Sequence, residues 1–221
     1  PNYTATNVPP RGALDIAALD EKYRIERDKR IRKEGQNQYA AAGSQEVKET
    51  YEHDPYMEVA PREPVTKDID VVILGGGFSG VLAGVELAKQ GITNIANIDH
   101  AGDFGGVWYW NRYPGARVDI ESVEYFYSFD VDLQQEWKWP EYFSAQPDLE
   151  RYANHVADRF ELRKNIRMSN PVKSLRFDEA TNRWHVHAAN GDHVICKHVV
   201  AATGALSAPN MPNWPGRENF K

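Results

Sequence analysis

Residues 69–90 follow the order of an apolar strand, a glycine-rich turn and a helix. Residues 69–74 are apolar except for Asp70, and residues 81–90 have helical spacing. The turn between them, Gly75-Gly76-Gly77-Phe78-Ser79-Gly80, fits the pattern G-x-G-x-x-G. In that pattern the first glycine permits the turn, the second lets backbone approach a pyrophosphate, and the third lets the helix pack on the strand. Because the free N–H groups of the helix start then face the phosphates, the sequence predicts a dinucleotide-binding turn.

A second apolar run, residues 94–98, ends at Asp99, roughly 20 residues beyond the glycine-rich turn. At this place a dinucleotide-binding fold carries an acid that accepts hydrogen bonds from a ribose hydroxyl. A carboxylate there repels a 2'-phosphate, so the position favours FAD or NAD over NADP. The alternative is a solvated loop acid, and the strand, the spacing and the glycines together favour the ribose contact.

Composition excludes several classes of partner. The 221-residue chain has a net charge of -6, whereas a nucleic-acid partner needs a basic face. No apolar run approaches ~18 residues, so we expect no membrane span. The chain starts without a signal pattern, and its one cysteine, Cys196, cannot form an internal disulfide. We expect a cytoplasmic protein in which Cys196 is a small buried apolar side chain.

Residues 1–66 differ in composition from the rest and are predicted to precede a dinucleotide-binding domain of residues 67–221. Residues 15–34 have helical spacing of apolar residues among mixed charges, which is typical of a surface helix. Residues 35–67 contain several prolines and predict an extended connector that lies over the domain. Possible i,i+4 ion pairs in the helix are Lys22 with Glu26, Glu26 with Arg30, and Asp28 with Arg32.

The remaining pattern predicts an α/β fold. Apolar residues between 149 and 160 recur at helical spacing and indicate one buried stripe. Residues 172–177, 183–188 and 193–196 alternate as strands, with an Asn190-Gly191 hairpin turn before the last. A further apolar strand, 197–202, returns toward the nucleotide. We therefore expect a Rossmann-like FAD-binding domain with a parallel sheet and a three-stranded antiparallel insertion, after a helical and extended amino-terminal part.

Four histidines occur in the strand region without a recognisable ligand set. Neither H-x-x-x-H nor a Cys/His combination accompanies His185, His187, His193 and His198. Polar faces of exposed strands explain them, and we predict no metal. Hydrolase chemistry has no support either, since no G-x-S-x-G elbow is present.

A second glycine-rich segment is more specific. Residues 105–119 read Gly-Gly-Val-Trp-Tyr-Trp-Asn-Arg-Tyr-Pro-Gly-Ala-Arg-Val-Asp. This segment resembles, at every fixed position, the motif [AG]-G-x-W-x(4)-[FY]-P-[GM]-x(3)-D of the flavin-dependent Baeyer-Villiger monooxygenases. The resemblance extends from about residue 68 to the carboxyl end. The helix around residues 21–39 resembles the amino-terminal extension of some longer members.

The resemblance implies an FAD site made of both glycine-rich segments. Asp99 would contact the adenosine ribose, where many relatives have the longer Glu. The pyrophosphate would be held by Gly75, Gly77 and Gly80, with Phe78 and Ser79 in the same loop. The flavin side would be lined by Gly106, Val107 and Trp108, with Tyr125 on the cofactor and the backbone of Val172 at the adenine end.

Asp119 is the catalytic candidate that the resemblance implies. The acid at this place in the family lies near the isoalloxazine and orients an arginine that stabilises the flavin peroxide and the nicotinamide. The alternative for Asp119 is a helix cap or a loop acid. For Trp108 and Trp110 the alternative is core packing.

The chemistry implied by the resemblance is insertion of one oxygen atom into a ketone. NADPH reduces FAD, O2 adds at flavin C4a, and the deprotonated peroxide attacks the carbonyl to give an ester or lactone. Alternatives are a related monooxygenase that oxidises nitrogen or sulfur, and a non-catalytic FAD-binding fragment. Attack on a ketone uses the peroxyanion and transfer to nitrogen or sulfur uses the hydroperoxide, so protonation state separates the two reactions.

Two expected features of the family are missing. No second G-x-G-x-x-G for NADPH occurs, and no region supplies the partner arginine. The family signature F-x-G-x(3)-H-x(3)-W would begin at Phe220 and stops after Lys221. We therefore expect the amino-terminal part of a larger enzyme, inactive alone, whose partners are a ketone, O2 and the remaining portion of the same enzyme.

Overall fold

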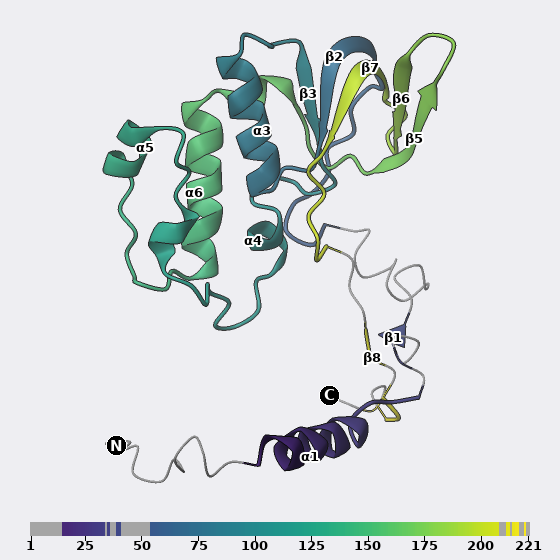
Figure 1. Ribbon diagram of the computed structural model, residues 1–221. Coiled ribbons are helices and arrows are strands. Elements are labelled where there is room, and N and C mark those ends of the chain that lie inside the picture. Colours follow the sequence, from purple (N-terminus) through teal and green to yellow (C-terminus); the bar gives the residue numbers. More distant parts are fainter. Residues whose placement is uncertain are drawn as a thin grey trace. The chain divides into compact units, whose positions relative to one another are not determined.

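The structure is a computed structural model that describes residues 15–33, 35, 39–40, 54–207, 211–212, 214–216 and 219. Residues 41–53 of the predicted connector and the signature start at Phe220 lie outside the described residues. The chain divides into two compact units, residues 48–209 and residues 1–47 with 210–221 (Figure 1).

The described residues of the smaller unit form a surface helix and a short strand pair. Helix α1 (Ile16–Asp28) has no buried residue, and the Asp15 carboxylate caps its start by accepting from the Ala18 N–H at 3.0 Å. The predicted surface helix is confirmed, and it ends at Asp28, before the end of the predicted range of residues 15–34. Strand β1 (Tyr39–Ala40) pairs antiparallel with β8 (Met211–Pro212).

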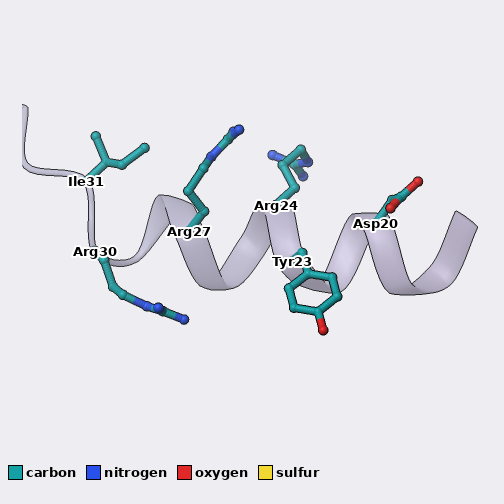
Figure 2. A pocket seen from close by; sticks show the side chains of 6 residues that line it. All are labelled: Asp20, Tyr23, Arg24, Arg27, Arg30 and Ile31. Carbon is teal, nitrogen blue, oxygen red and sulfur yellow. The ribbon is translucent and has the colours of Figure 1, made fainter. Parts of the chain in front are cut away.

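The ion pairs on α1 differ from the three predicted ones. Arg24 bridges Glu21 at 2.7 Å and Asp28 at 3.0 Å, and Lys29 pairs with Glu26 at 2.6 Å. The forked guanidinium of Arg24 holds two acids at once, and the spacing i,i+3 competes with i,i+4 on one helix face. Figure 2 shows the side chains that line an open pocket at this helix surface: Asp20, Tyr23, Arg24, Arg27, Arg30 and Ile31.

The larger unit is built on one six-stranded sheet with the order β4-β3-β2-β7-β6-β5 (Figure 1). Four neighbouring strands pair parallel, and β6 pairs antiparallel with β7 on one side and β5 on the other, which confirms the predicted α/β, Rossmann-like fold. The parallel-paired strands are β2 (Thr66–Leu74), β3 (Ile95–Ile98), β4 (Ile166–Arg167) and β7 (His193–Ala201), and the antiparallel pairs are completed by β5 (Val172–Asp178) and β6 (Arg183–Ala188).

One strand assignment needs correction. The segments 193–196 and 197–202, predicted as separate strands, form the single strand β7. Strand β2 pairs with β7 from Thr66 opposite His193 to Leu74 opposite Ala201. A single ladder of hydrogen bonds therefore spans both predicted segments. The antiparallel insertion is therefore continuous with the parallel sheet. The predicted connector ends at Val65, because β2 begins at Thr66.

Helices α3 (Phe78–Lys89) and α6 (Gln146–Arg159) lie side by side next to the sheet, with α5 (Val131–Glu136) beyond α6 (Figure 1). The predicted stripe on α6 is confirmed: Leu149, Tyr152, Ala153, Val156 and Ala157 are buried. Helix α3 begins at Phe78, earlier than the apolar spacing indicates, because the Val81 N–H already donates to the Gly77 carbonyl at 3.0 Å. The helix start therefore lies inside the glycine-rich turn.

Both faces of the central strands are buried. Val71 and Ile73 of β2 cluster with Leu87 of α3, whereas Val72 and Leu74 belong to a cluster that contains Cys196. Two-sided burial explains why the second half of β2, from Val71 to Leu74, is continuously apolar. The Cys196 thiol is fully buried, which raises its pKa and confirms its role as an apolar core side chain. None of the described helices has the length and apolar character of a bilayer crossing.

The described part of the predicted connector, residues 54–65, is fastened to the larger unit by hydrogen bonds. Arg62 donates to the Met168 carbonyl at 2.6 Å, and the Val65 N–H donates to the Asp192 carboxylate at 2.9 Å. Asp192 is 1% exposed and also receives both guanidinium arms of Arg167 at 2.8 Å. The hairpin turn before β7 thus anchors the chain segment that enters β2.

Three of the four histidines stack across the antiparallel strands. The rings of His187 and His193 lie 4.2 Å apart, and His185 Nδ1 lies 2.9 Å from His193 Nε2. His185 also faces Asp178 at 4.0 Å. Within the described ranges, no three or more His, Cys, Asp or Glu residues are grouped so that they hold a metal ion.

This stack makes stability depend on pH. Burial, with the charges of His187 and His185, holds the pKa of His193 below its ordinary value of 6.5. Since the unfolded chain takes up the proton more readily, the contribution of His193 is complete above pH 6.5 and declines as pH falls through the folded-state pKa. We expect a lower urea midpoint at about pH 5.5 than at about pH 7.5, and a smaller difference in His193→Gln. The exposed His198, varied to Gln, is the control, and an equal pH effect in both variants would contradict the assignment.

Candidate functional site

The first glycine-rich turn lies where β2 ends, and only glycine fits at two of its positions. Gly75 has φ +112°, and a Cβ there would lie 2.3 Å from the Ala202 carbonyl oxygen. A Cβ on Gly80 would lie 1.9 Å from the carbonyl oxygen of Gly75. The turn is thus closed onto the end of β7 on one side and the start of α3 on the other. In open α/β sheets ligands bind outside these carboxyl ends of the parallel strands.

The second glycine-rich turn packs backbone to backbone on the first. The Gly105 N–H donates to the Gly76 carbonyl at 3.0 Å. Gly106 has φ +58°, and a Cβ on it would lie 2.8 Å from the Cα of Gly77. The sequence predicts both turns, but their mutual contact appears only in the structure. Where Gly106 meets Gly77, the two turns are in backbone contact with no room for a side chain between them.

Asp99 lies directly after β3, and its carboxylate is hydrogen-bonded to the first glycine-rich turn. Its side chain is 8% exposed, Oδ2 accepts from the Gly76 N–H, and Oδ1 accepts from the Ala101 N–H at 2.9 Å. Burial opposes ionisation, but hydrogen bonds from His100, Ala101 and Gly76 outweigh it and keep the pKa of Asp99 below 3.8. The carboxylate is therefore ionised and is not a solvated loop acid. Because a carboxylate offers about four acceptor positions, room remains for a ribose hydroxyl.

An aromatic group lies beside the two turns. Tyr125, from the short helix η3 (Ser122–Tyr125), makes edge contacts with Phe78 at 5.5 Å and with Trp108 at 5.8 Å between ring centres. Trp108 belongs to the short helix α4 (Val107–Trp110), in which Val107 is exposed. The structure thus brings Phe78, Trp108 and Tyr125 together from three separate segments.

Asp119 is exposed and lies near this aromatic group. Burial raises the pKa of Tyr125, a hydrogen bond from Trp108 opposes the rise, and the charge of Asp119 adds to it. Within residues 54–207, neither a cation nor a hydrogen-bond donor is paired with the Asp119 carboxylate. The alternative role of Asp119 as a helix N-cap has no support, because Glu121 is the N-cap of η3.

Val172 and Ser79 occupy the edges of the site. Ser79 is exposed in the first turn of α3, next to the glycines. Val172 begins β5 and is half-buried. The chain that enters β5 runs along the Asp99 segment, since the Asn170 N–H donates to the Asp99 carbonyl at 2.8 Å. Trp110, outside the predicted set, stacks on His100 at 4.5 Å.

Two side chains that support the turns carry no sequence signal. Tyr127 is buried and donates to the Phe78 carbonyl at 2.7 Å, which fixes the start of α3. Asp54, in the connector, is buried and accepts from Tyr109 next to the second turn. Neither belongs to a motif, and both act over about 50 residues of sequence separation. A local pattern therefore cannot identify them.

Comparisons with known proteins agree with this geometry. The family model for pyridine nucleotide-disulphide oxidoreductases matches residues 72–221. A Baeyer-Villiger monooxygenase of Streptomyces coelicolor is 39% identical over 208 residues, which are 93% of this chain and 34% of the relative.

Solved structures show the same likeness. The polycyclic ketone monooxygenase of the fungus Thermothelomyces thermophila superposes with a TM-score of 0.79 at 28% identity, over 92% of this chain and 35% of that one. An oxidized steroid monooxygenase bound to NADP has a TM-score of 0.65 at 45% identity, over 69% and 29%. The chain spans about a third of the length of these relatives.

The parallel sheet and the paired glycine turns define an α/β domain of the Rossmann kind, a class of fold that binds dinucleotides in many proteins. The chain belongs to the pyridine nucleotide-disulphide oxidoreductase family. It is a homologue of one part of the Baeyer-Villiger monooxygenases, which confirms the resemblance in residues 105–119.

Proposed function

We propose that this chain is the FAD-binding part of a Baeyer-Villiger monooxygenase that uses NADPH and O2 to convert a ketone into an ester or lactone. The observation that carries the proposal is the contact between the two glycine turns. Gly106, in the family motif, meets Gly77, in the dinucleotide motif, where a Cβ would lie 2.8 Å from backbone. This close approach keeps side chains out of the space that a pyrophosphate needs.

The residues fit FAD. The start of α3 presents free N–H groups for the pyrophosphate, from the turn that holds Gly75, Gly77 and Gly80. Asp99 is ionised and accepts from a ribose hydroxyl, while Val172 lies where the chain passes Asp99 toward an adenine. Phe78, Trp108 and Tyr125 cover the flavin side and exclude water. When bound, FAD supplies the electron transfer and oxygen activation that amino-acid side chains lack.

Asp119 acts in this proposal through a cation. Its exposed carboxylate, beside Tyr125, holds an arginine contributed by another part of the protein. A fixed cation at this place stabilises negative charge on oxygen during oxygen transfer. We assign the NADPH site mainly to the remaining portion of the enzyme, because this chain spans about a third of its relatives and has one dinucleotide turn.

The proposed function is tested on the full-length protein. A visible absorption spectrum reports bound flavin, and NADPH consumption is followed with and without a cyclic ketone. We expect a yellow protein, ketone-dependent turnover, and an ester or lactone as product. Oxidation of amines or sulfides alone favours the related monooxygenase, and a flavin-loaded protein without turnover favours the non-catalytic alternative. A protein that takes up no flavin contradicts the proposal.

Asp99 gives a separate prediction about cofactor affinity. Asp99→Asn keeps the size of the side chain but removes the charge that strengthens a ribose hydrogen bond. We expect FAD affinity to fall on the order of tenfold. The control is Asp103→Asn, a neighbouring acid whose carboxylate pairs with Arg163 at 2.8 Å. Equal affinities of the two variants, measured by flavin fluorescence, would return Asp99 to a purely structural role.

A further inference from the structure

Asp54 is a buried carboxylate that belongs to the connector. It is 6% exposed and lies 12 positions before the first residue of β2, Thr66. Asp54 belongs to neither the dinucleotide motif nor the monooxygenase motif. A buried acid without an ion pair needs several hydrogen-bond donors, so its neighbours show what it holds in place.

The donors to Asp54 come from both ends of one loop. The Gly102 N–H and the Tyr109 hydroxyl both donate to Oδ2, at 2.8 and 2.6 Å, and the Tyr56 N–H donates to Oδ1 at 2.9 Å. Gly102 precedes the second glycine turn and Tyr109 follows it. A single carboxylate therefore joins the two flanks of the turn.

Tyr109 is a reliable donor in this arrangement. Its side chain is 2% exposed, and burial together with the Asp54 carboxylate raises its pKa, so the hydroxyl keeps its proton. Tyr109 also packs closely on the turn, because a Cβ on Gly105 would lie 3.1 Å from the Tyr109 backbone nitrogen and 3.2 Å from its Cβ. The hydrogen bond to Asp54 thus fixes Tyr109, the residue on which Gly105 of the turn packs.

The connector also packs on the loop sterically. A Cβ on Gly102 would lie 2.7 Å from the sulfur of Met57 and 2.7 Å from the Tyr109 hydroxyl. Tyr56 covers the same place, with an edge contact to the Tyr109 ring at 5.8 Å and a hydrogen bond to the Trp110 carbonyl at 3.1 Å. Three of the four positions from 54 to 57, namely Asp54, Tyr56 and Met57, thus touch the loop that carries Gly105 and Gly106.

We infer that Asp54 is a positioning residue for the second glycine turn, and that residues 54–57 clamp this turn in the geometry that receives FAD. The part of the inference that concerns FAD rests on the proposed function. Asp54 touches no cofactor in this role. It acts through Gly102 and Tyr109, which hold Gly106 against Gly77.

The clamp is tested by hydrogen exchange and by FAD affinity in the full-length protein. In Asp54→Ala we expect amides in residues 102–110 to exchange on the order of tenfold faster, with the amides of β2 and β7 unchanged. The dissociation constant for FAD rises on the order of tenfold. Tyr109→Phe removes one of the two contacts at Oδ2 and gives a smaller change in the same residues. Asp54→Asn keeps an acceptor and restores part of the protection.

A half-buried helix cap, Asp130, separates this role from general destabilisation. Asp130 accepts from the Leu133 N–H at 2.7 Å at the start of α5 and bonds to neither glycine turn. Asp130→Ala should leave the exchange of residues 102–110 and the FAD affinity unchanged. Equal exchange in Asp54→Ala and the wild type, or the same loosening in Asp130→Ala, overturns the inference. If the wild type binds no FAD, the proposed function fails, and the exchange measurement still decides the clamp.

Discussion

Replacing Gly75 by alanine is expected to abolish FAD retention and to destabilise the domain by about 3 kcal/mol or more. Two costs add at this position. The residue has φ +112°, which side-chain-bearing residues rarely adopt, and the new Cβ would lie 2.3 Å from the Ala202 carbonyl oxygen. Because that oxygen belongs to the backbone at the end of β7, relief requires the turn to move away from the sheet. The same movement disrupts the surface that receives the pyrophosphate.

Gly91→Ala is the matched control for Gly75→Ala. Gly91 also has a positive φ, +76°, but a Cβ there meets nothing within 4 Å. The Gly91→Ala variant therefore measures the loss of unfolding free energy that comes from the backbone conformation alone, about 1 kcal/mol, without a steric clash. Urea unfolding and the flavin absorbance of both purified variants provide the comparison. If Gly75→Ala retains flavin as well as Gly91→Ala does, the steric account of the turn is wrong.

Replacing Asp119 by alanine is expected to lower ester formation by about 100-fold while flavin content stays near that of the wild type. The carboxylate is exposed and bonds to neither glycine turn, so its loss does not disturb the backbone that holds the cofactor. Under the proposed function, the variant loses the charge that holds a cation beside the reacting oxygen. We expect kcat to fall more than KM changes, and NADPH consumption to continue without ester, since electrons still reach O2.

Two variants accompany Asp119→Ala. Asp119→Asn keeps the shape without the charge and should behave like the alanine variant if the charge matters. Glu124→Ala removes an exposed acid from η3, five positions away, and should leave activity unchanged. Full activity in Asp119→Ala, with tight coupling of NADPH consumption to ester, would remove Asp119 from the mechanism.

Several features of the larger unit could be predicted because they are local. The strand, turn and helix around Gly75 follow from apolar runs and glycine spacing, and the stripe on α6 follows from helical periodicity. The motif from Gly105 to Asp119 indicated the family, which the comparisons confirm. The roles of the individual site residues stay predictions.

Other features could not be predicted because they depend on pairing partners. The division of β7 into two strands was wrong, since β2 on the neighbouring side sets the length of the ladder. The ion pairs on α1 were wrong, because the spacings i,i+3 and i,i+4 are close in energy on an exposed helix. The stack of His187 on His193 arises from the register of β6 against β7, which sequence alternation leaves open.

Glycine spacing and apolar periodicity in this chain specify a dinucleotide-binding fold, because tight turns and buried strands restrict residue types one position at a time. Tertiary structure alone decided that Gly106 lies on Gly77 and that Asp54 holds both flanks of the second turn. Such contacts join residues about 30 to 50 positions apart, and loop closure, packing and hydrogen-bond satisfaction across the whole domain select them. These long-range constraints therefore cannot be predicted from a short stretch of sequence.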